Sequence, residues 1–265
     1  MEMGLVMKII VTGSTGFIGK HLVKKLNEDG HDIIQWDRSH GWNIADFTSD
    51  KVQADVDFVV HLAAIADVRR SLKEPELYWT TNVEYSKKIF DLCYKNNIPV
   101  VYASSSCVHA WWKSPYGTSK KAMEAIAHPG QIGLRFTTVF GEGARETMLM
   151  SRIRNGTVKF ATEHIRDLIF VDDVVSAIMI FVNNGTKDKN ATYEVGTGQG
   201  TKVSDIVKHA GYDVPTQEGQ DAEANDNTAD NSELRKLGWK PTLTAKEWID
   251  IRIAVDYTNR LGEPK

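Results

Sequence analysis

The sequence predicts an α/β protein with a doubly wound, mostly parallel sheet and a small C-terminal lobe over the ends of the strands. Short apolar runs rich in β-branched residues alternate with helical patterns in the first half of the chain, as is typical of parallel βαβ units. A turn with three glycines joins the first of these runs to the first helix. A chain of 265 residues accommodates one large α/β domain, or one domain with a small lobe.

The individual elements follow from hydrophobic periodicity, which separates short buried strands from one-sided helices. The predicted strands are 9–11, 31–37, 58–64 and 100–103, and the predicted helices follow residue 19, span 76–95, open at 116, follow 172, and span 232–238 and 245–261. Residues 217–231 are acidic and polar with almost no apolar side chains, which predicts a loop or a poorly ordered segment.

The composition is that of an ordinary globular protein, with 42% hydrophobic and 25% charged residues. A net charge of −3 argues against a nucleic-acid partner, and no apolar run approaches the ~20 residues of a membrane span. The two cysteines, Cys93 and Cys107, have neither metal-site nor disulfide spacing. We therefore expect a cytoplasmic protein without a bound metal and without a nucleic-acid or membrane partner.

The stretch TGSTGFIG at residues 12–19 has the glycine spacing of a dinucleotide-binding turn. In such a turn the first glycine bends the chain, the second lets the backbone approach a pyrophosphate, and the third lets the helix pack on the strand. The start of the helix then offers free N–H groups to the anion. The predicted cofactor-binding residues of this turn are Gly13, Thr15, Gly16, Phe17, Ile18 and Gly19.

Asp37 ends the second predicted strand, 18 residues after Gly19, close to the spacing expected of the carboxylate that binds the adenosine ribose. A carboxylate there repels a 2′-phosphate, so NAD is favoured. Arg38 follows directly and keeps NADP open as the cofactor. The third strand runs into Leu62, Ala63 and Ala64, where side chains that are mostly small leave room for a ligand at the carboxyl end of the sheet.

A possible catalytic group follows the fourth strand. Residues 104–107 read SSSC, and Tyr116 and Lys120 open the next helix at positions i and i+4, which share one helix face. A nearby ammonium favours the phenolate form of a tyrosine and makes it a usable base near neutral pH. Downstream of a dinucleotide fingerprint, this pattern is a specific signal.

These motifs together resemble the extended short-chain dehydrogenase/reductase family, and most closely its NAD-dependent epimerase/dehydratase branch, which acts on nucleotide sugars. The matching pieces are TGSTGFIG at 12–19, HLAA at 61–64, ASSSCVH at 103–109, SPYGTSK at 114–120, LRFTTVFG at 134–141, RDLIFVDDVV at 166–175, YEVGTG at 193–198 and LRKLGWKP at 234–241. The resemblance implies a Rossmann-like core at residues 7–140. Residues 141–265 would complete this core and form a small substrate-binding lobe.

The resemblance also implies roles for individual residues. Tyr116 would be the general base, Lys120 its partner and a ribose ligand, and Ser105 the hydroxyl that holds the reacting oxygen. Arg166 would bind a substrate diphosphate, a bidentate task suited to guanidinium, unless it forms a surface salt bridge with Asp167. The other implied cofactor contacts are Asn43, Ile44 and Asn82, and the other implied substrate contacts are Ser106, Cys107 and Thr138.

Departures from the family pattern limit the expected reaction. Ser106 and Cys107 replace the Asp and Glu of the family's 4,6-dehydratases, which removes the acid–base pair that elimination needs. The family's tyrosine after the serines is His109, Thr138 replaces an asparagine, and several pocket segments are short. We expect a nucleotide-sugar epimerase. A keto-sugar or other carbonyl reductase and a non-catalytic NAD(P)-binding protein remain the alternatives.

Two further expectations concern surfaces. Trp111 and Trp112 lie between the serine cluster and Tyr116, and they predict either a pocket wall or an exposed loop with one tryptophan buried. Members of the family often pair through the helices that correspond to 76–95 and 116–127, so a homodimer is expected.

Overall fold

The structure is a computed structural model that describes residues 5–52, 55–187 and 189–252. The expected helix at 245–261 is present over residues 245–252, and its remainder lies outside the described residues.

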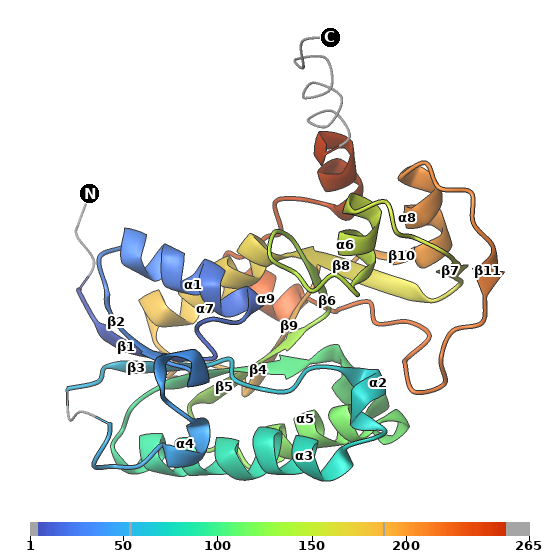
Figure 1. Cartoon of the computed structure of the whole chain (residues 1–265). Helices are drawn as coiled ribbons and strands as arrows, with labels where there is room; N and C mark the ends of the chain where they lie inside the picture. Colours follow the sequence, from blue (N-terminus) through green and yellow to red (C-terminus); the bar gives the residue numbers. More distant parts are fainter. Residues whose placement is uncertain (1–4, 53–54, 188, 253–265) are drawn as a thin grey trace.

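A six-stranded parallel sheet forms the centre of the molecule (Figure 1). Its order is β2-β1-β3-β4-β5-β9, and every neighbouring pair of strands is parallel. The chain order reverses at β1, which lies between β2 and β3, so the predicted doubly wound sheet is confirmed. The strands are β1 (Lys8–Thr12), β2 (Asp32–Trp36), β3 (Phe58–His61), β4 (Val100–Ser105), β5 (Gln131–Phe136) and β9 (Thr192–Val195).

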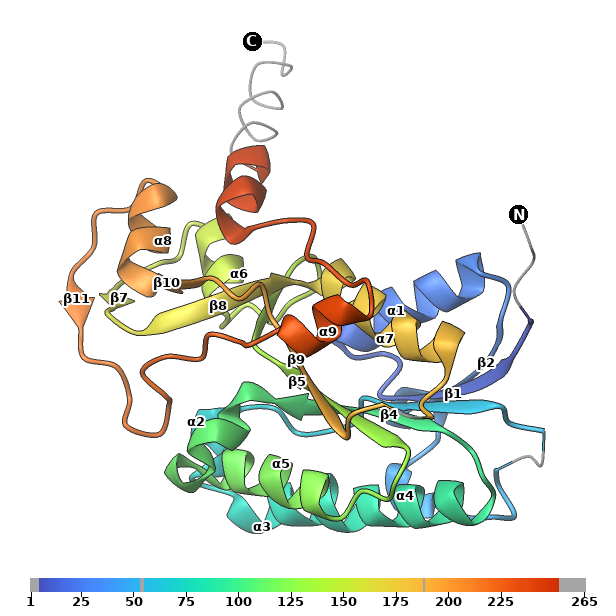
Figure 2. The same ribbon diagram turned by 180° about the vertical axis from the view of Figure 1, so that it is seen from behind.

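Helices cover both faces of this sheet (Figures 1 and 2). Alternate residues of β1 face opposite sides, so Ile9 and Val11 pack in one core cluster and Ile10 packs in the other. One face carries α1 (Phe17–Glu28), α7 (Val171–Asn184) and α9 (Ser232–Lys236). The other face carries α2 (Val68–Ser71), α3 (Pro75–Trp79), α4 (Tyr85–Lys95) and α5 (Pro115–Ala125).

The predicted helix 76–95 is interrupted by one π-helical segment, η3 (Thr80–Glu84), between α3 and α4. Asn82 lies in this segment and is fully buried. Its side chain accepts a hydrogen bond from the Ile65 N–H and donates to the Ile65 carbonyl and the Ser119 hydroxyl. The widened turn therefore lets one amide join the loop after β3 to helix α5.

The lobe lies beyond the carboxyl ends of the parallel strands, where Figure 1 shows it at the upper right. A small core of Phe140, Met150, Leu168 and Trp248 holds it together. We propose the division 7–140 and 141–265, in which the second part also supplies strand β9 to the main sheet and helix α7 to one of its faces, while residues 138–140 at the end of the first part belong to the lobe. The lobe contains β6 (Thr138–Phe140), α6 (Leu149–Arg154), β7 (Ala161–Thr162), β8 (Ile165–Phe170), β10 (Gly200–Lys202), α8 (Val203–His209) and β11 (Thr216–Gln217).

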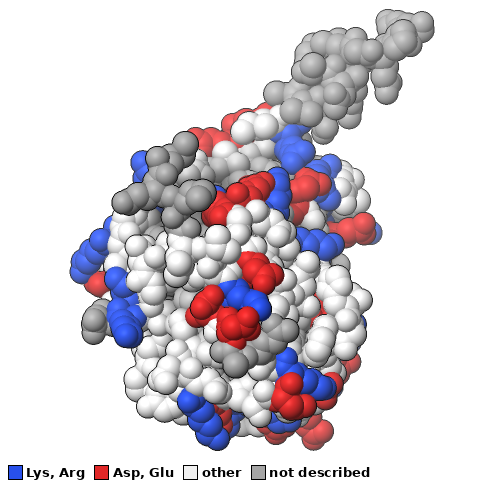
Figure 3. Space-filling view, turned by 90° about the vertical axis from the view of Figure 1, so that its left-hand side faces the viewer, with Lys and Arg blue, Asp and Glu red and all other residues white. Residues whose placement is uncertain are grey.

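The face at the amino ends of the strands is seen in Figure 3. Acidic and basic side chains are interspersed on it, and no extended basic patch is seen among the described residues that are coloured. At this edge Lys8 forms ion pairs with Asp32 and Asp55. The described residues also contain no helix with the length and apolar character of a membrane span. Pairing through α3–α4 and α5 remains a prediction, which light scattering can measure.

A buried carboxylate attaches the C-terminal segment to α7. Asp173, in the first turn of α7, is 1% exposed. It accepts hydrogen bonds from the N–H and hydroxyl of Thr242 and from the N–H of Leu243. Trp239 donates to the Asp173 carbonyl. Backbone and hydroxyl donors thus satisfy this buried charge without a basic side chain.

We expect Asp173→Ala to lower the free energy of unfolding by about 2–4 kcal/mol, because the N–H groups of Thr242 and Leu243 lose their acceptor and the C-terminal segment loses its attachment to α7. The matched control is Asp172→Ala, which removes only a solvent-exposed pair with His21 and should cost less than about 1 kcal/mol. Urea unfolding followed by circular dichroism measures both. Equal losses in the two variants would contradict the anchoring role of Asp173.

Candidate active site

A cavity of about 1150 Å³ lies between the carboxyl ends of the parallel strands and the lobe. Loops after β1, β3, β4 and β5 form one side of it, and the lobe forms the other. It brings together most of the site residues predicted from the sequence, namely Gly13, Gly16, Phe17, Ile18, Gly19, Leu62, Ala64, Ser105, Ser106, Cys107, Tyr116, Lys120, Thr138 and Arg166. Those that do not line it are Thr15, Asp37, Arg38, Asn43, Ile44, Ala63 and Asn82.

The glycine turn forms a cradle that only glycine permits. Gly13 has φ +69°, and a Cβ atom there would come within 2.8 Å of the Ala63 nitrogen. A Cβ on Gly19 would overlap the carbonyl oxygen of Gly13. Ser14, in the same turn, has a buried hydroxyl without a hydrogen-bond partner among the described residues. A close backbone approach and free N–H groups at the start of α1 fit a dinucleotide pyrophosphate.

Asp37 lies beside this turn. It accepts hydrogen bonds from the N–H and hydroxyl of Ser39 and, at 3.4 Å, from the Thr15 N–H. Burial opposes its ionisation, but these hydrogen bonds outweigh burial and hold the pKa of its carboxyl below the ordinary value. The carboxylate is thus held in its charged form beside the glycine turn. Arg38 is exposed, and its side chain makes no hydrogen bond or ion pair within the described part of the chain.

Three other predicted cofactor residues have structural contacts of their own. Asn43 caps the short helix η2 (Ile44–Asp46) by accepting from the Ala45 N–H. Ile44 is buried in the core cluster between the sheet and α4. The Asn82 side chain forms its hydrogen bonds with Ile65 and Ser119. Contacts from Asn43, Ile44 and Asn82 to a cofactor remain proposals.

The three predicted catalytic residues converge on the floor of the cavity. Ser105 ends β4, and its hydroxyl accepts from the Cys107 N–H at the start of η4 (Ser106–Lys113). Helix α5 begins beside it, with Ser114 as its N-cap and Pro115 in its first turn, both of which favour a helix start. Tyr116 is 8% exposed and Lys120 is 2% exposed.

Burial dominates the protonation of this group. It raises the pKa of the Tyr116 phenol, an effect that Cys107 reinforces and a hydrogen bond with Ser105 opposes. It also lowers the pKa of Lys120 to about 7, against a smaller opposing effect of Glu124. The Lys120 ammonium donates to the Ala103 carbonyl at 2.7 Å and lies 6.0 Å from the centre of the Tyr116 ring. In the protein alone, burial, Cys107 and Ser105 therefore influence the pKa of the Tyr116 phenol more than Lys120 does.

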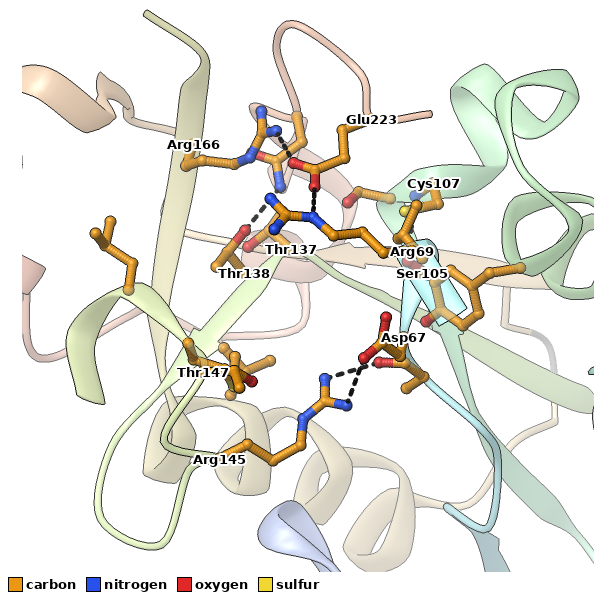
Figure 4. A pocket seen from close by; sticks show the side chains of 18 of the residues that line it. Asp67, Arg69, Ser105, Cys107, Thr137, Thr138, Arg145, Thr147, Arg166 and Glu223 are labelled. Carbon is orange, nitrogen blue, oxygen red and sulfur yellow. Dashed lines mark hydrogen bonds and ion pairs between the residues drawn. The ribbon is translucent and has the colours of Figure 1, made fainter. Parts of the chain in front are cut away.

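The far side of the cavity holds Arg166, but its partner differs from both predicted ones. Its guanidinium donates to Glu223 at 2.9 Å (Figure 4). It also donates to the carbonyls of Ile165 and Ala224. Asp167, expected as the alternative partner, is fully buried and faces away. Thr138 accepts from the Asn227 amide. Glu223 could not be predicted as a site residue, because the composition of residues 217–231 indicates only a polar loop.

The structure also shows the surroundings of the two tryptophans, of His61 and of Cys107. Trp111 and Trp112 are 42% and 66% exposed and do not line the cavity, so the expectation of a pocket wall or of one buried tryptophan is wrong. His61 is a packed strand residue, bonded to Thr12 and Ser86, and burial lowers its pKa to about 3. Burial raises the pKa of the Cys107 thiol, so Cys107 is a neutral cavity residue.

A comparison with known families identifies the class. The model described as "NAD dependent epimerase/dehydratase family" matches residues 9–196, so the chain belongs to this family. Its cofactor is NAD, which the cradle and the carboxylate at Asp37 fit.

Individual relatives are similar over most of the chain. Protein CapI of Staphylococcus aureus is 31% identical, covering 65% of this chain and 68% of CapI. A putative UDP-glucose 4-epimerase of Methanocaldococcus jannaschii is 28% identical, covering 91% and 95% of the two chains. Among solved structures, MoeE5 in complex with UDP-glucuronic acid and NAD superposes with a TM-score of 0.79 at 27% identity, covering 96% and 99%.

The burial of Lys120 predicts a pH-dependent cost to stability. A pKa of about 7 in the folded chain against 10.5 for an ordinary lysine corresponds to roughly 5 kcal/mol. The full cost applies below pH 7, where Lys120 is protonated in both states. Between pH 7 and 10.5 the unfolded chain binds a proton that the folded chain does not, so stability rises with pH and the cost disappears.

We therefore expect Lys120→Met to be more stable than the wild type at pH 6, with a gain that shrinks toward pH 9. Thermal melts at several pH values measure the difference. The control Lys121→Met replaces an exposed neighbour and should show no such trend. A Lys120→Met difference independent of pH would show that the ammonium is not destabilised by burial.

Proposed function

We propose that this protein is an NAD-dependent, nucleotide-sugar epimerase-type oxidoreductase that acts at a carbon of the sugar ring. The observation that carries the proposal is the convergence of Ser105, Tyr116 and Lys120 in one cavity. This cavity extends from the glycine turn to Arg166. A protein that only bound a nucleotide would not need a buried tyrosine and lysine beside a hydroxyl at the end of the strand.

The residues divide the work in the following way. NAD, when bound, accepts a hydride from the sugar carbon and can return it. Tyr116, as the phenolate, takes the proton of the sugar hydroxyl as that carbon loses its hydride, and the alcohol becomes a ketone. Ser105 donates a hydrogen bond to the same oxygen. If the hydride returned to the opposite face, Tyr116 would give its proton back to the same oxygen, and the product would be the epimer.

The protein alone stabilises the phenolate only in part, because burial raises the pKa of Tyr116. The positive charges of Lys120 and of the oxidised cofactor would both favour the phenolate once NAD is bound. Lys120 therefore has two proposed tasks, electrostatic support of the base and a hydrogen bond to the nicotinamide ribose. Its contact with the Ala103 carbonyl holds the ammonium in position for both.

The surroundings of Tyr116 favour epimerisation over elimination. Ser106 and Cys107 line the cavity where a dehydratase of the family would present Asp and Glu. A 4,6-dehydratase would lack its acid–base pair here.

Nucleotide sugars are the proposed substrates for two reasons. The solved relative MoeE5 is in complex with UDP-glucuronic acid and NAD. The cavity is also rich in arginines, with Arg69, Arg145, Arg152 and Arg166 among its lining residues, and guanidinium suits phosphate oxygens.

A panel of nucleotide sugars tests the proposal. Each is mixed with the protein and NAD, and the products are separated while absorbance at 340 nm is recorded. An epimer without net NADH supports the proposal. In a parallel assay that supplies NADH and a keto-sugar, consumption of NADH would identify a reductase instead. Binding of NAD without turnover of any sugar would favour a non-catalytic binding protein.

On a verified substrate, we expect Tyr116→Phe to lose about 10²- to 10⁴-fold in kcat, because the general base is removed. Affinity for NAD should barely change, and titration calorimetry checks this. The control Tyr102→Phe removes a buried phenol hydroxyl that lies against Gly133 on β5, outside the cavity, and should keep its activity. Near-full turnover in Tyr116→Phe would refute the assigned base.

A further inference from the structure

The cavity contains a carboxylate at the place where an anion would bind. Glu223 accepts from Arg166 at 2.9 Å through one oxygen and from Arg69 at 3.2 Å through the other. Its side chain is 23% exposed, and that of Arg166 is 13% exposed. Figure 4 shows Glu223 between the two guanidinium groups, which come from opposite sides of the cavity. Arg69 follows β3, whereas Arg166 lies on β8 of the lobe.

Glu223 is fixed in place by the backbone around it. The Ala224 carbonyl accepts from Arg166, and the Asn225 carbonyl accepts from the Ile165 N–H. Asn227 bonds to the Asp167 N–H and to Thr138. The segment 223–227 therefore runs along β8, and the position of the Glu223 carboxylate is set by the fold.

Most other arginines of the cavity are also paired. Arg145 pairs with Asp67 at 3.6 Å, and Arg70 pairs with Glu74. Arg152, on α6, lines the cavity, and its guanidinium makes no hydrogen bond or ion pair with the described residues. An anion that enters would therefore meet one unpaired guanidinium, Arg152, and would need to compete for Arg166.

We propose that Glu223 is a built-in competitor for the anion subsite and that the substrate's diphosphate displaces it from Arg166. This inference rests on the proposed function, in which Arg166 receives that diphosphate. A diphosphate carries more negative charge than one carboxylate and offers more acceptor oxygens to a planar guanidinium. Arg152 adds a cation that Glu223 does not use. Glu223 thus makes binding depend on the charge of the ligand and selects against weakly charged ones.

Titration calorimetry on the NAD-saturated protein tests this. Saturation with NAD is meant to keep the anionic probes from binding at the glycine turn. The probes are UDP and inorganic pyrophosphate, and the variant is Glu223→Gln, which keeps the shape and removes the charge. We expect both probes to bind about three- to tenfold more tightly, since a competing, partly exposed ion pair is lost. In an Arg166→Gln background, the same substitution should give little or no gain.

The control Glu146→Gln removes the same charge from the exposed loop beside Arg145, outside the cavity lining, and should leave both affinities within twofold. Unchanged or weaker binding to Glu223→Gln, or no binding of either probe to it, would overturn the proposal. So would an equal gain in the Arg166→Gln background.

The two proposals fail separately. Tighter pyrophosphate with no preference for UDP would support the role of Glu223 and count against a nucleotide substrate. Strong UDP binding without a gain in Glu223→Gln would do the reverse.

Discussion

The buried carboxylate of Asp167 holds the two halves of the site together. It accepts hydrogen bonds from the N–H and hydroxyl of Thr197 and from the N–H groups of Gly198 and Ala229. A Cβ on Gly196 would come within 2.6 Å of this carboxylate, so glycine is needed there. These bonds join β8 of the lobe to the chain after β9 of the main sheet. Because neighbouring residues of a strand face opposite sides, burying Asp167 turns Arg166 toward the cavity.

The sequence predicts the parts of the structure whose signals are local. The turn at Gly13, the strand ending at Asp37, and the pair Tyr116 and Lys120 each depend on spacings of a few residues or on one βαβ unit, and their positions agree with the structure. The ion pair of Arg69 and Glu223 joins residues 154 positions apart, and no spacing rule reaches that far. The π-helical turn at Asn82 also depends on tertiary partners, so periodicity alone predicts a regular helix.

The protonation states of the proposed catalytic residues could not be predicted from the sequence motif. The spacing of Tyr116 and Lys120 places both on one helix face, which suggests mutual stabilisation of phenolate and ammonium. In the folded chain both are almost fully buried, and burial disfavours the charged form of each. The result is a neutral tyrosine and a lysine with a pKa of about 7. In the proposed mechanism, the positive charge of the oxidised cofactor would therefore be needed for Tyr116 to act as a base, which would couple the chemistry to the cofactor.

The composition of the segment around Glu223 is compatible with the proposed displacement of its carboxylate from Arg166. Residues 217–231 contain almost no apolar side chains, so burial of hydrophobic surface does not hold them. They are held by hydrogen bonds to β8 and by partly exposed ion pairs to Arg69 and Arg166. Such contacts are individually weak in water and are replaced without creating a cavity in the core. Under the proposal, a diphosphate would therefore bind Arg166 in place of Glu223 while the core beneath β8, fixed by Asp167, stays unchanged.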